Sequence, residues 1–284
     1  MPTRAMIAVH GRDGLEQNSW FARRRDFFVT SMLKGFYRAA GGFLQIYQGY
    51  LKTGTVPYNE IDKLVGTETR KGCLWQLKDD CHQLWRNGDS AFELNGSLLD
   101  WIIGSLFHEA MKLKENIYLF EYYAPLAHDL KGVWRQEIQQ FCGVECRRFM
   151  ERISHEVDRQ MESLGFMFGR AIYLLRTMLP SQAHNPLLLR YLIEHPDVAS
   201  ELWSESLDEI FKDMFHGVPE SGYCLAAQSY FDGNWYEKSL AAYQEALRVN
   251  GHCDEAILRT SQLEALLTKA NKNHRDNSRR TQLQ

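Results

Sequence analysis

Two short segments carry histidine and glutamate side chains in an order that zinc proteases use. One segment, HEAMKLKE, begins at His108, and the other, HEVDRQME, begins at His155. The zinc motif HExxH needs a second histidine one helical turn after the first, on the same face of the helix. Lys112 and Arg159 hold those places here, and their charged side chains do not ligate zinc. The metalloprotease interpretation therefore fails.

The same two segments leave a weaker alternative open. His108 and Glu115 share one helix face, as do His155 and Glu162. Two helices that each offer a histidine and a carboxylate could bind a metal inside a bundle, as ferritin-like proteins do. Those proteins use Glu-x-x-His, which neither helix contains, and two helical turns separate the members of each pair by about 10 Å. A helical-bundle enzyme or carrier that binds a metal or cofactor remains the alternative hypothesis.

Other templates for chemistry are missing from the chain. The sequence contains no GxGxxG, GxxxxGK[ST] or GxSxG motif and no CxxC pair, although it has six cysteines. Most of the cysteines fall on apolar helix faces, which favours reduced, buried thiols over disulfides or a zinc site. We therefore expect no catalytic residue and no cofactor, and the chain is more typical of a non-enzyme.

The composition predicts an all-α fold. The 284 residues include 44% hydrophobic and 12% aromatic residues and only seven prolines, which is enough for a packed core of long helices. A net charge of −3 and a pI near 6.4 argue against nucleic-acid binding. The sequence has no secretory signal and no apolar run near 18 residues, so we expect a cytoplasmic protein without stable membrane insertion.

Apolar periodicity divides the chain into four parts. We expect a flexible arm over residues 1–18 and a helical bundle over 19–180. Tandem helical hairpins with a capping helix follow over 185–270, and a disordered basic tail over 271–284. The helices expected in the bundle span 19–52, 58–65, 73–86, 97–123, 132–163 and 166–179. Arg23, Arg24 and Arg25 beside aromatic residues on the first helix leave open a third hypothesis, peripheral membrane attachment.

The segment GYCLAAQSYFDGNWYEKSLAAYQEALRVNG, residues 222–251, predicts a helical hairpin. Small and aromatic residues recur at i, i+4 and i+7 on both sides of a turn at Gly233. The small residues allow two helices to approach, and the aromatic residues fill the remaining space. A hairpin this short needs neighbours to bury both of its faces.

This segment resembles a tetratricopeptide repeat. The family pattern asks for a large, a small and a tyrosine residue, then after the turn two small residues around an aromatic one, and a closing proline. The chain fills these places, in order, with Tyr223, Ala227, Tyr230, Ser239, Tyr243, Ala246 and Gly251. One period upstream, residues 185–218 have the length of a helix pair without the signature, and residues 254–270 predict a capping helix.

The resemblance implies recognition of another protein or peptide. In that family the first helix of each pair lines a concave groove. By resemblance, the partner-binding residues here are Cys224, Gln228, Phe231 and Asp232. The leading hypothesis is therefore a non-catalytic scaffold or adaptor protein that uses a helical groove.

Overall fold

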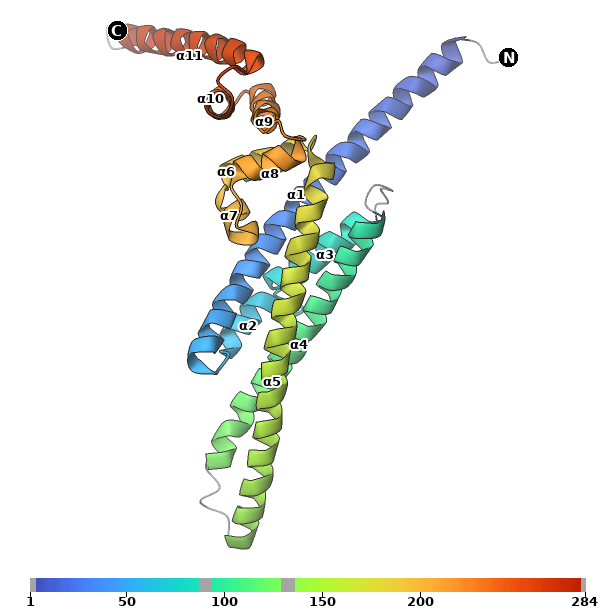
Figure 1. The fold of residues 1–284 in the computed structure, drawn as a ribbon, viewed down its shortest axis with the longest axis vertical. Coiled ribbons are helices and arrows are strands. Elements are labelled where there is room, and N and C mark those ends of the chain that lie inside the picture. Colours follow the sequence, from blue (N-terminus) through green and yellow to red (C-terminus); the bar gives the residue numbers. More distant parts are fainter. Residues whose placement is uncertain (1–3, 87–92, 129–135, 282–284) are drawn as a thin grey trace. The chain divides into compact units, whose positions relative to one another are not determined.

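A computed structural model describes residues 4–86, 93–128 and 136–281 of the chain. Within these ranges the backbone forms eleven α-helices and one short 3₁₀ helix, with no β-strand (Figure 1). A single isolated β-bridge joins Gly66 and Lys71. The all-α fold class predicted from the sequence is confirmed.

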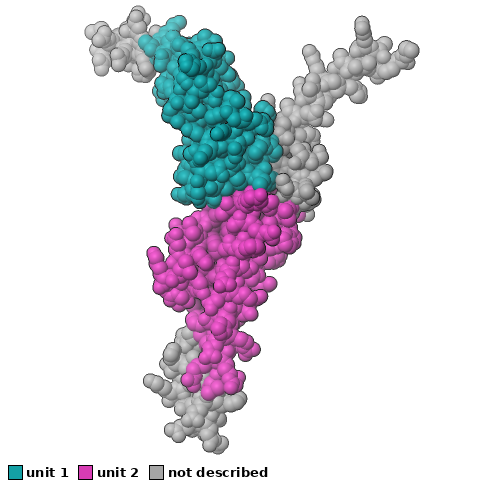
Figure 2. Space-filling model, viewed as in Figure 1, with its two compact units in different colours: residues 1–30, 176–284 teal, residues 31–175 magenta. Residues whose placement is uncertain are grey.

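The helices gather into two compact units (Figure 2). Unit 1 combines residues 1–30 with residues 176–284, and unit 2 consists of residues 31–175. Unit 2 is therefore inserted into unit 1 in the sequence. Two long helices, α1 and α5, cross the boundaries between the units.

Unit 2 is a bundle built from five helices. They are α1 (Arg4–Thr53), α2 (Tyr58–Val65), α3 (Cys73–Arg86), α4 (Glu93–His128) and α5 (Gln136–Met178), of which α1 and α5 belong to it in part. The helix α3 packs along α4, and α2 packs against both. Phe36 and Phe43 of α1 pack on Phe168 of α5, with ring centroids 6.0 and 4.7 Å apart. Aromatic contacts thus join the first and last helices of the bundle.

A tight turn between α2 and α3 is held by a buried lysine. Gly66 adopts a φ of 77°, and a Cβ atom there would lie 2.2 Å from the carbonyl oxygen of Arg70, so only glycine fits. Lys114 of α4 donates hydrogen bonds to the Gly66 carbonyl (2.8 Å) and to Asp62 Oδ1 (2.5 Å). The lysine side chain is only 10% exposed, so it links α4 to the end of α2 from inside the bundle.

Unit 1 contains the remaining helices. They are the 3₁₀ helix η3 (Leu179–Gln182) and α6 (Pro186–Glu194), α7 (Asp197–Trp203), α8 (Leu207–Met214), α9 (Glu220–Asp232), α10 (Tyr236–Val249) and α11 (Asp254–Thr281). The helix α9 packs against α10, α6 and α8, and α11 packs against α10.

Side-chain caps start two of the short helices in unit 1. Asn185 Oδ1 accepts from the Leu188 amide at the start of α6, while its amide group donates to the Asp26 carbonyl at 3.2 Å. Ser206 and Glu209 form a reciprocal capping box at the start of α8. The Asn185 contact joins the two segments of the chain that make up unit 1.

Several helices extend beyond their predicted ends. The helix α1 already begins at Arg4, within the segment expected to be an arm, and α11 continues to Thr281, within the expected tail. Once a helix has formed, each added residue gains a hydrogen bond, so helices propagate into weakly periodic sequence. The helix α4 was expected to end before Pro125 but continues to His128, with Pro125 in its last turn.

Other predicted boundaries are wrong in the middle of the chain. The two helices expected over 132–163 and 166–179 are one helix, α5, because buried Leu164 and Phe168 on either side of Gly165 favour continuous packing. Residues 185–218 form three short helices instead of two, because Pro196 follows the end of α6.

None of the helices in the described ranges combines the length and the apolar character that crossing a bilayer requires. The membrane-surface hypothesis depends on Arg23, Arg24 and Arg25. Their side chains are not among those that the structure describes.

Candidate functional site

The helices α9 and α10 form an antiparallel hairpin. Glu220 places an acidic side chain in the first turn of α9, and Glu237 does the same for α10, which stabilises both amino termini. Asn234 adopts a φ of 61° in the turn between them, a left-handed conformation that asparagine tolerates. The turn reverses the chain within three residues.

The interior of this hairpin is filled by the residues that the sequence pattern singled out. Tyr223, Ala227, Tyr230, Ser239, Tyr243 and Ala246 are all buried. Ser239 Oγ donates a hydrogen bond to the Ala227 carbonyl at 2.8 Å, so the two helix backbones approach closely at this point. Small residues were expected to let the two helices approach, and Ala227 and Ser239 do so here.

Two tyrosine hydroxyls connect the hairpin to the preceding helices. Tyr223 donates to Asp208 Oδ1 at 2.6 Å, and Tyr230 donates to Glu194 Oε1 at 3.0 Å. Burial, followed by the adjacent carboxylate, raises the pKa of each tyrosine above its ordinary value. Both hydroxyls therefore stay protonated as donors, and α9 is fixed to α6 and to α8.

Cations from two helices surround the end of α9. The Arg190 guanidinium lies 4.1 Å from the Trp235 ring centroid and 4.8 Å from that of Tyr230. Lys238 pairs with Glu194 at 2.7 Å and lies 5.2 Å from the Trp235 ring. Trp235 is still 47% exposed, so this cluster presents an aromatic ring and two cations at the surface.

The four residues predicted to bind a partner differ in their exposure. Asp232 is exposed and accepts a 2.7 Å hydrogen bond from the side-chain amide of Gln228, which is half-buried. Phe231 is half-buried, with its ring edge-on to Tyr236 at 5.4 Å. Cys224 is buried, and its Sγ lies 3.8 Å from Sγ of Cys253. Three of the four thus reach the surface, whereas Cys224 is withdrawn from it.

Three helices of unit 1 begin at equal intervals. The first residues of α6, α9 and α11 are Pro186, Glu220 and Asp254, so each helix starts 34 residues after the one before. A residue of α9 therefore has counterparts at the same helical position in α6 and α11. The counterparts of Cys224 are Arg190 and Leu258, and those of Gln228 are Glu194 and Gln262.

Sequence reasoning missed the surface residues of α6 and α11. Leu258 and Leu266, the counterparts of Cys224 and Asp232 in α11, are exposed leucines. The 34-residue interval between the helix starts identifies these positions, whereas the sequence signature does not, because neither residues 185–218 nor residues 254–270 carry it. We use the name stack surface for the exposed or half-buried residues Arg190, Glu194, Gln228, Phe231, Asp232, Leu258, Gln262 and Leu266.

The predicted alternative metal ligands lie on the surface of unit 2. His108, Glu115, His155 and Glu162 are all exposed. Within the described parts of the chain, no three histidine, cysteine, aspartate or glutamate side chains gather closely enough to hold a metal ion. The structure does not bring these four residues together as a ligand set.

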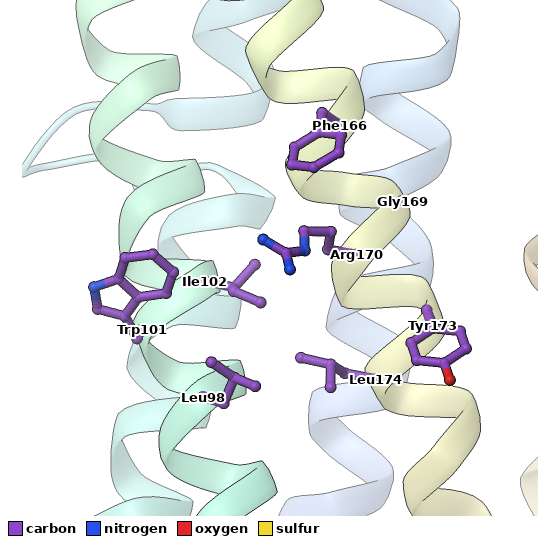
Figure 3. Close-up of a pocket in the computed structure, with 8 residues that line it drawn as sticks. All are labelled: Leu98, Trp101, Ile102, Phe166, Gly169, Arg170, Tyr173 and Leu174. Atoms are coloured by element: carbon purple, nitrogen blue, oxygen red, sulfur yellow. The ribbon is translucent and has the colours of Figure 1, made fainter.

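A separate groove lies between α4 and α5 in unit 2 (Figure 3). Its volume is about 420 Å³, and Leu98, Ile102 and Leu174 line it together with Arg170. Large aromatic side chains stand at its edges and are strongly exposed, namely Trp101, Phe166 and Tyr173. The Arg170 guanidinium lies 5.4 Å from the Phe166 ring centroid and is the one charged group among the residues that line the groove.

Comparison with protein-family models, with curated proteins and with solved structures finds no match to this chain.

Proposed function

We propose that the chain is a non-catalytic interaction protein whose stack surface in unit 1 binds a segment of another protein. The observation that carries the proposal is the 34-residue interval between the starts of α6, α9 and α11. This interval equals the period of tetratricopeptide repeats, in which successive first helices line one groove. The buried signature positions of the α9–α10 hairpin support the same interpretation.

The chemistry of the stack surface favours a peptide or helix over a small ligand. Apolar side chains (Phe231, Leu258, Leu266) alternate with hydrogen-bonding ones (Gln228, Gln262), and Arg190 and Asp232 add charges of both signs. A partner segment with apolar anchors and polar backbone or side-chain groups complements such a mixed surface. The first half of the stack departs from the family pattern, because α6 is short and α7 and α8 replace one second helix.

The experiment compares proteins captured by the full chain and by charge variants. Leu258→Asp places a carboxylate on the stack surface at a residue that is 59% exposed, so the fold tolerates it. Leu51→Asp is the matched control, the same change at a residue of unit 2 that is 66% exposed. We expect partners of the unmodified chain to be lost with Leu258→Asp and retained with Leu51→Asp. Identical capture by all three proteins contradicts the proposal.

A second candidate function is that of a ligand carrier, and the α4–α5 groove favours it. Its aromatic edges and Arg170 suit an apolar ligand with an anionic group. The fluorescent probe anilinonaphthalene sulfonate has this chemistry. We expect Arg170→Gln to weaken probe binding about tenfold, the effect of losing one charge-assisted contact. Arg159→Gln, on the same helix and exposed, is the control, and equal binding by both variants rejects this candidate.

A further inference from the structure

Cys224 and Cys253 form a thiol pair inside unit 1. Their Sγ atoms are 3.8 Å apart, although the residues are 29 positions apart in the sequence. Cys224 is buried in α9, and Cys253 is half-buried immediately before α11. Both are free thiols, and neither belongs to the stack surface.

The backbone around the pair is fixed by bonds that do not involve the sulfur atoms. The Cys253 amide donates to the Asn250 carbonyl at 3.1 Å, and its carbonyl accepts from the Ile257 amide at 3.0 Å. The Asn250 side chain donates to Glu220 Oε1 at 2.6 Å, which joins the loop before α11 to the first residue of α9. The two thiols are therefore held opposite each other by the fold itself.

We propose that this pair is a modification site at which a small disulfide, such as oxidised glutathione, is exchanged for an intramolecular Cys224–Cys253 disulfide. The half-buried Cys253 thiolate attacks one glutathione sulfur, which forms a mixed disulfide and releases one glutathione thiolate. Cys224 then loses its proton and attacks the Cys253 sulfur, which releases the second glutathione. Two protein thiols are oxidised and one glutathione disulfide is reduced to two thiols, so electrons and protons balance.

The order of attack follows from exposure and environment. Cys253 is reached from solvent, whereas Cys224 is 5% exposed. Burial raises the pKa of the Cys224 thiol, which keeps it protonated until the mixed disulfide lies beside it. The sulfur atoms must approach from 3.8 Å to a bond length of about 2 Å, so the two side chains must move toward each other.

The disulfide would link α9 directly to the start of α11. It would therefore fix two neighbouring first helices of the stack to each other. Its effect on partner binding depends on the proposed function, because these helices carry Gln228, Phe231 and Leu258 of the stack surface. Formation of the disulfide does not depend on that function and is tested on the isolated protein.

The experiment treats the reduced full chain with oxidised glutathione and maps its cysteines by peptide mass spectrometry without reduction. We expect the peptides of Cys224 and Cys253 to be joined, with the loss of two hydrogen atoms. Cys224→Ser should instead accumulate glutathione on Cys253, and Cys253→Ser should leave Cys224 unmodified. Cys73→Ser, which removes a half-buried cysteine of unit 2, is the control and should keep the link.

Two results overturn the proposal. One is a stable mixed disulfide on Cys253 of the unmodified chain without the internal link, and the other is the absence of any reaction at either cysteine. If the link forms but partner capture is the same for the reduced and oxidised chain, the site exists and its coupling to the stack surface is wrong. If no partner depends on Leu258, the proposed function fails while the link still stands.

Discussion

Ser239 Oγ donates a 2.8 Å hydrogen bond to the main-chain carbonyl of Ala227, and neither residue is exposed to solvent. The bond shows that α9 and α10 approach closely here, and it explains why both positions hold small residues. A side chain larger than serine at either position has no space unless the helices separate.

Enlarging Ser239 should therefore destabilise unit 1 more than removing its hydroxyl. We expect Ser239→Ala to lower the free energy of unfolding by about 1 kcal/mol, the net value of one hydrogen bond. Ser239→Leu should lower it by about 3 kcal/mol, because overpacking forces the helices apart. Urea denaturation followed by circular dichroism measures both. Ala241→Leu, at an exposed position of the same helix, is the control, and equal stability of the two leucine variants would refute this packing.

Gly222 and Gly41 should respond in opposite directions to alanine. A Cβ atom on Gly222 would lie 2.6 Å from Cδ2 of Phe211, so we expect Gly222→Ala to cost about 2 kcal/mol of stability through displaced aromatic rings. A Cβ atom on Gly41 meets nothing within 4 Å in the middle of α1, so Gly41→Ala should stabilise by about 1 kcal/mol. Thermal unfolding of both variants is the measurement. A stabilising Gly222→Ala would show that α8 and α9 pack differently.

Removing Asp62 should destabilise unit 2 more than removing the charge of Lys114. In Asp62→Ala the ammonium of Lys114 stays buried with only the Gly66 carbonyl as acceptor, so we expect a loss of about 3 kcal/mol. Lys114→Met removes the charge and leaves Asp62, which is 31% exposed, in contact with water. We expect the methionine variant to be the more stable of the two in urea. The reverse order would indicate that the lysine side chain is hydrated.

The stability of unit 1 should fall in acid partly through Asp208. The hydrogen bond from Arg248 holds the pKa of Asp208 below its ordinary value. Because this pKa is lower in the folded chain, ionised Asp208 stabilises the fold at pH values above its unfolded pKa of about 3.9. The stabilisation is lost as the pH falls through the folded pKa. We expect Asp208→Asn to be less stable than the unmodified chain at pH 7 and to match it more closely below pH 3. Parallel pH profiles would contradict this.

The parts of the fold that could be predicted have both a periodic apolar face and a clear end signal. The helices α2 and α3 were predicted with the bounds observed, and the apolar residues Leu74, Leu77 and Cys81 of α3 are buried. The α9–α10 hairpin was predictable because Gly233 separates two matching stripes. A helix end predicted near Gly165 is wrong. Buried side chains on both sides of this glycine favour one continuous helix by more than the glycine disfavours it.

The parts that could not be predicted depend on contacts between distant segments. Leu44 and Leu51 are apolar residues of α1 that are exposed, because none of the described helices of unit 2 covers these two side chains. Cys224 shares a helix face with Gln228, yet it is buried, and its Sγ lies 3.8 Å from Sγ of Cys253, which is 29 residues later in the chain. The capping box of Ser206 and Glu209 is a local signal that could have located α8.

The hydrogen bond from Asn185 to the Asp26 carbonyl has a consequence for biosynthesis. Its partners are separated by 159 positions, so Asn185 is incorporated roughly ten to thirty seconds after Asp26, at 5–20 residues per second. All of residues 31–175 are translated during that delay. The amino-terminal part of unit 1 therefore exists before the whole inserted bundle is made, and the rest of unit 1 follows only afterwards. A nascent chain that ends before Asn185 carries the Asp26 segment without the residues of unit 1 that complete its packing.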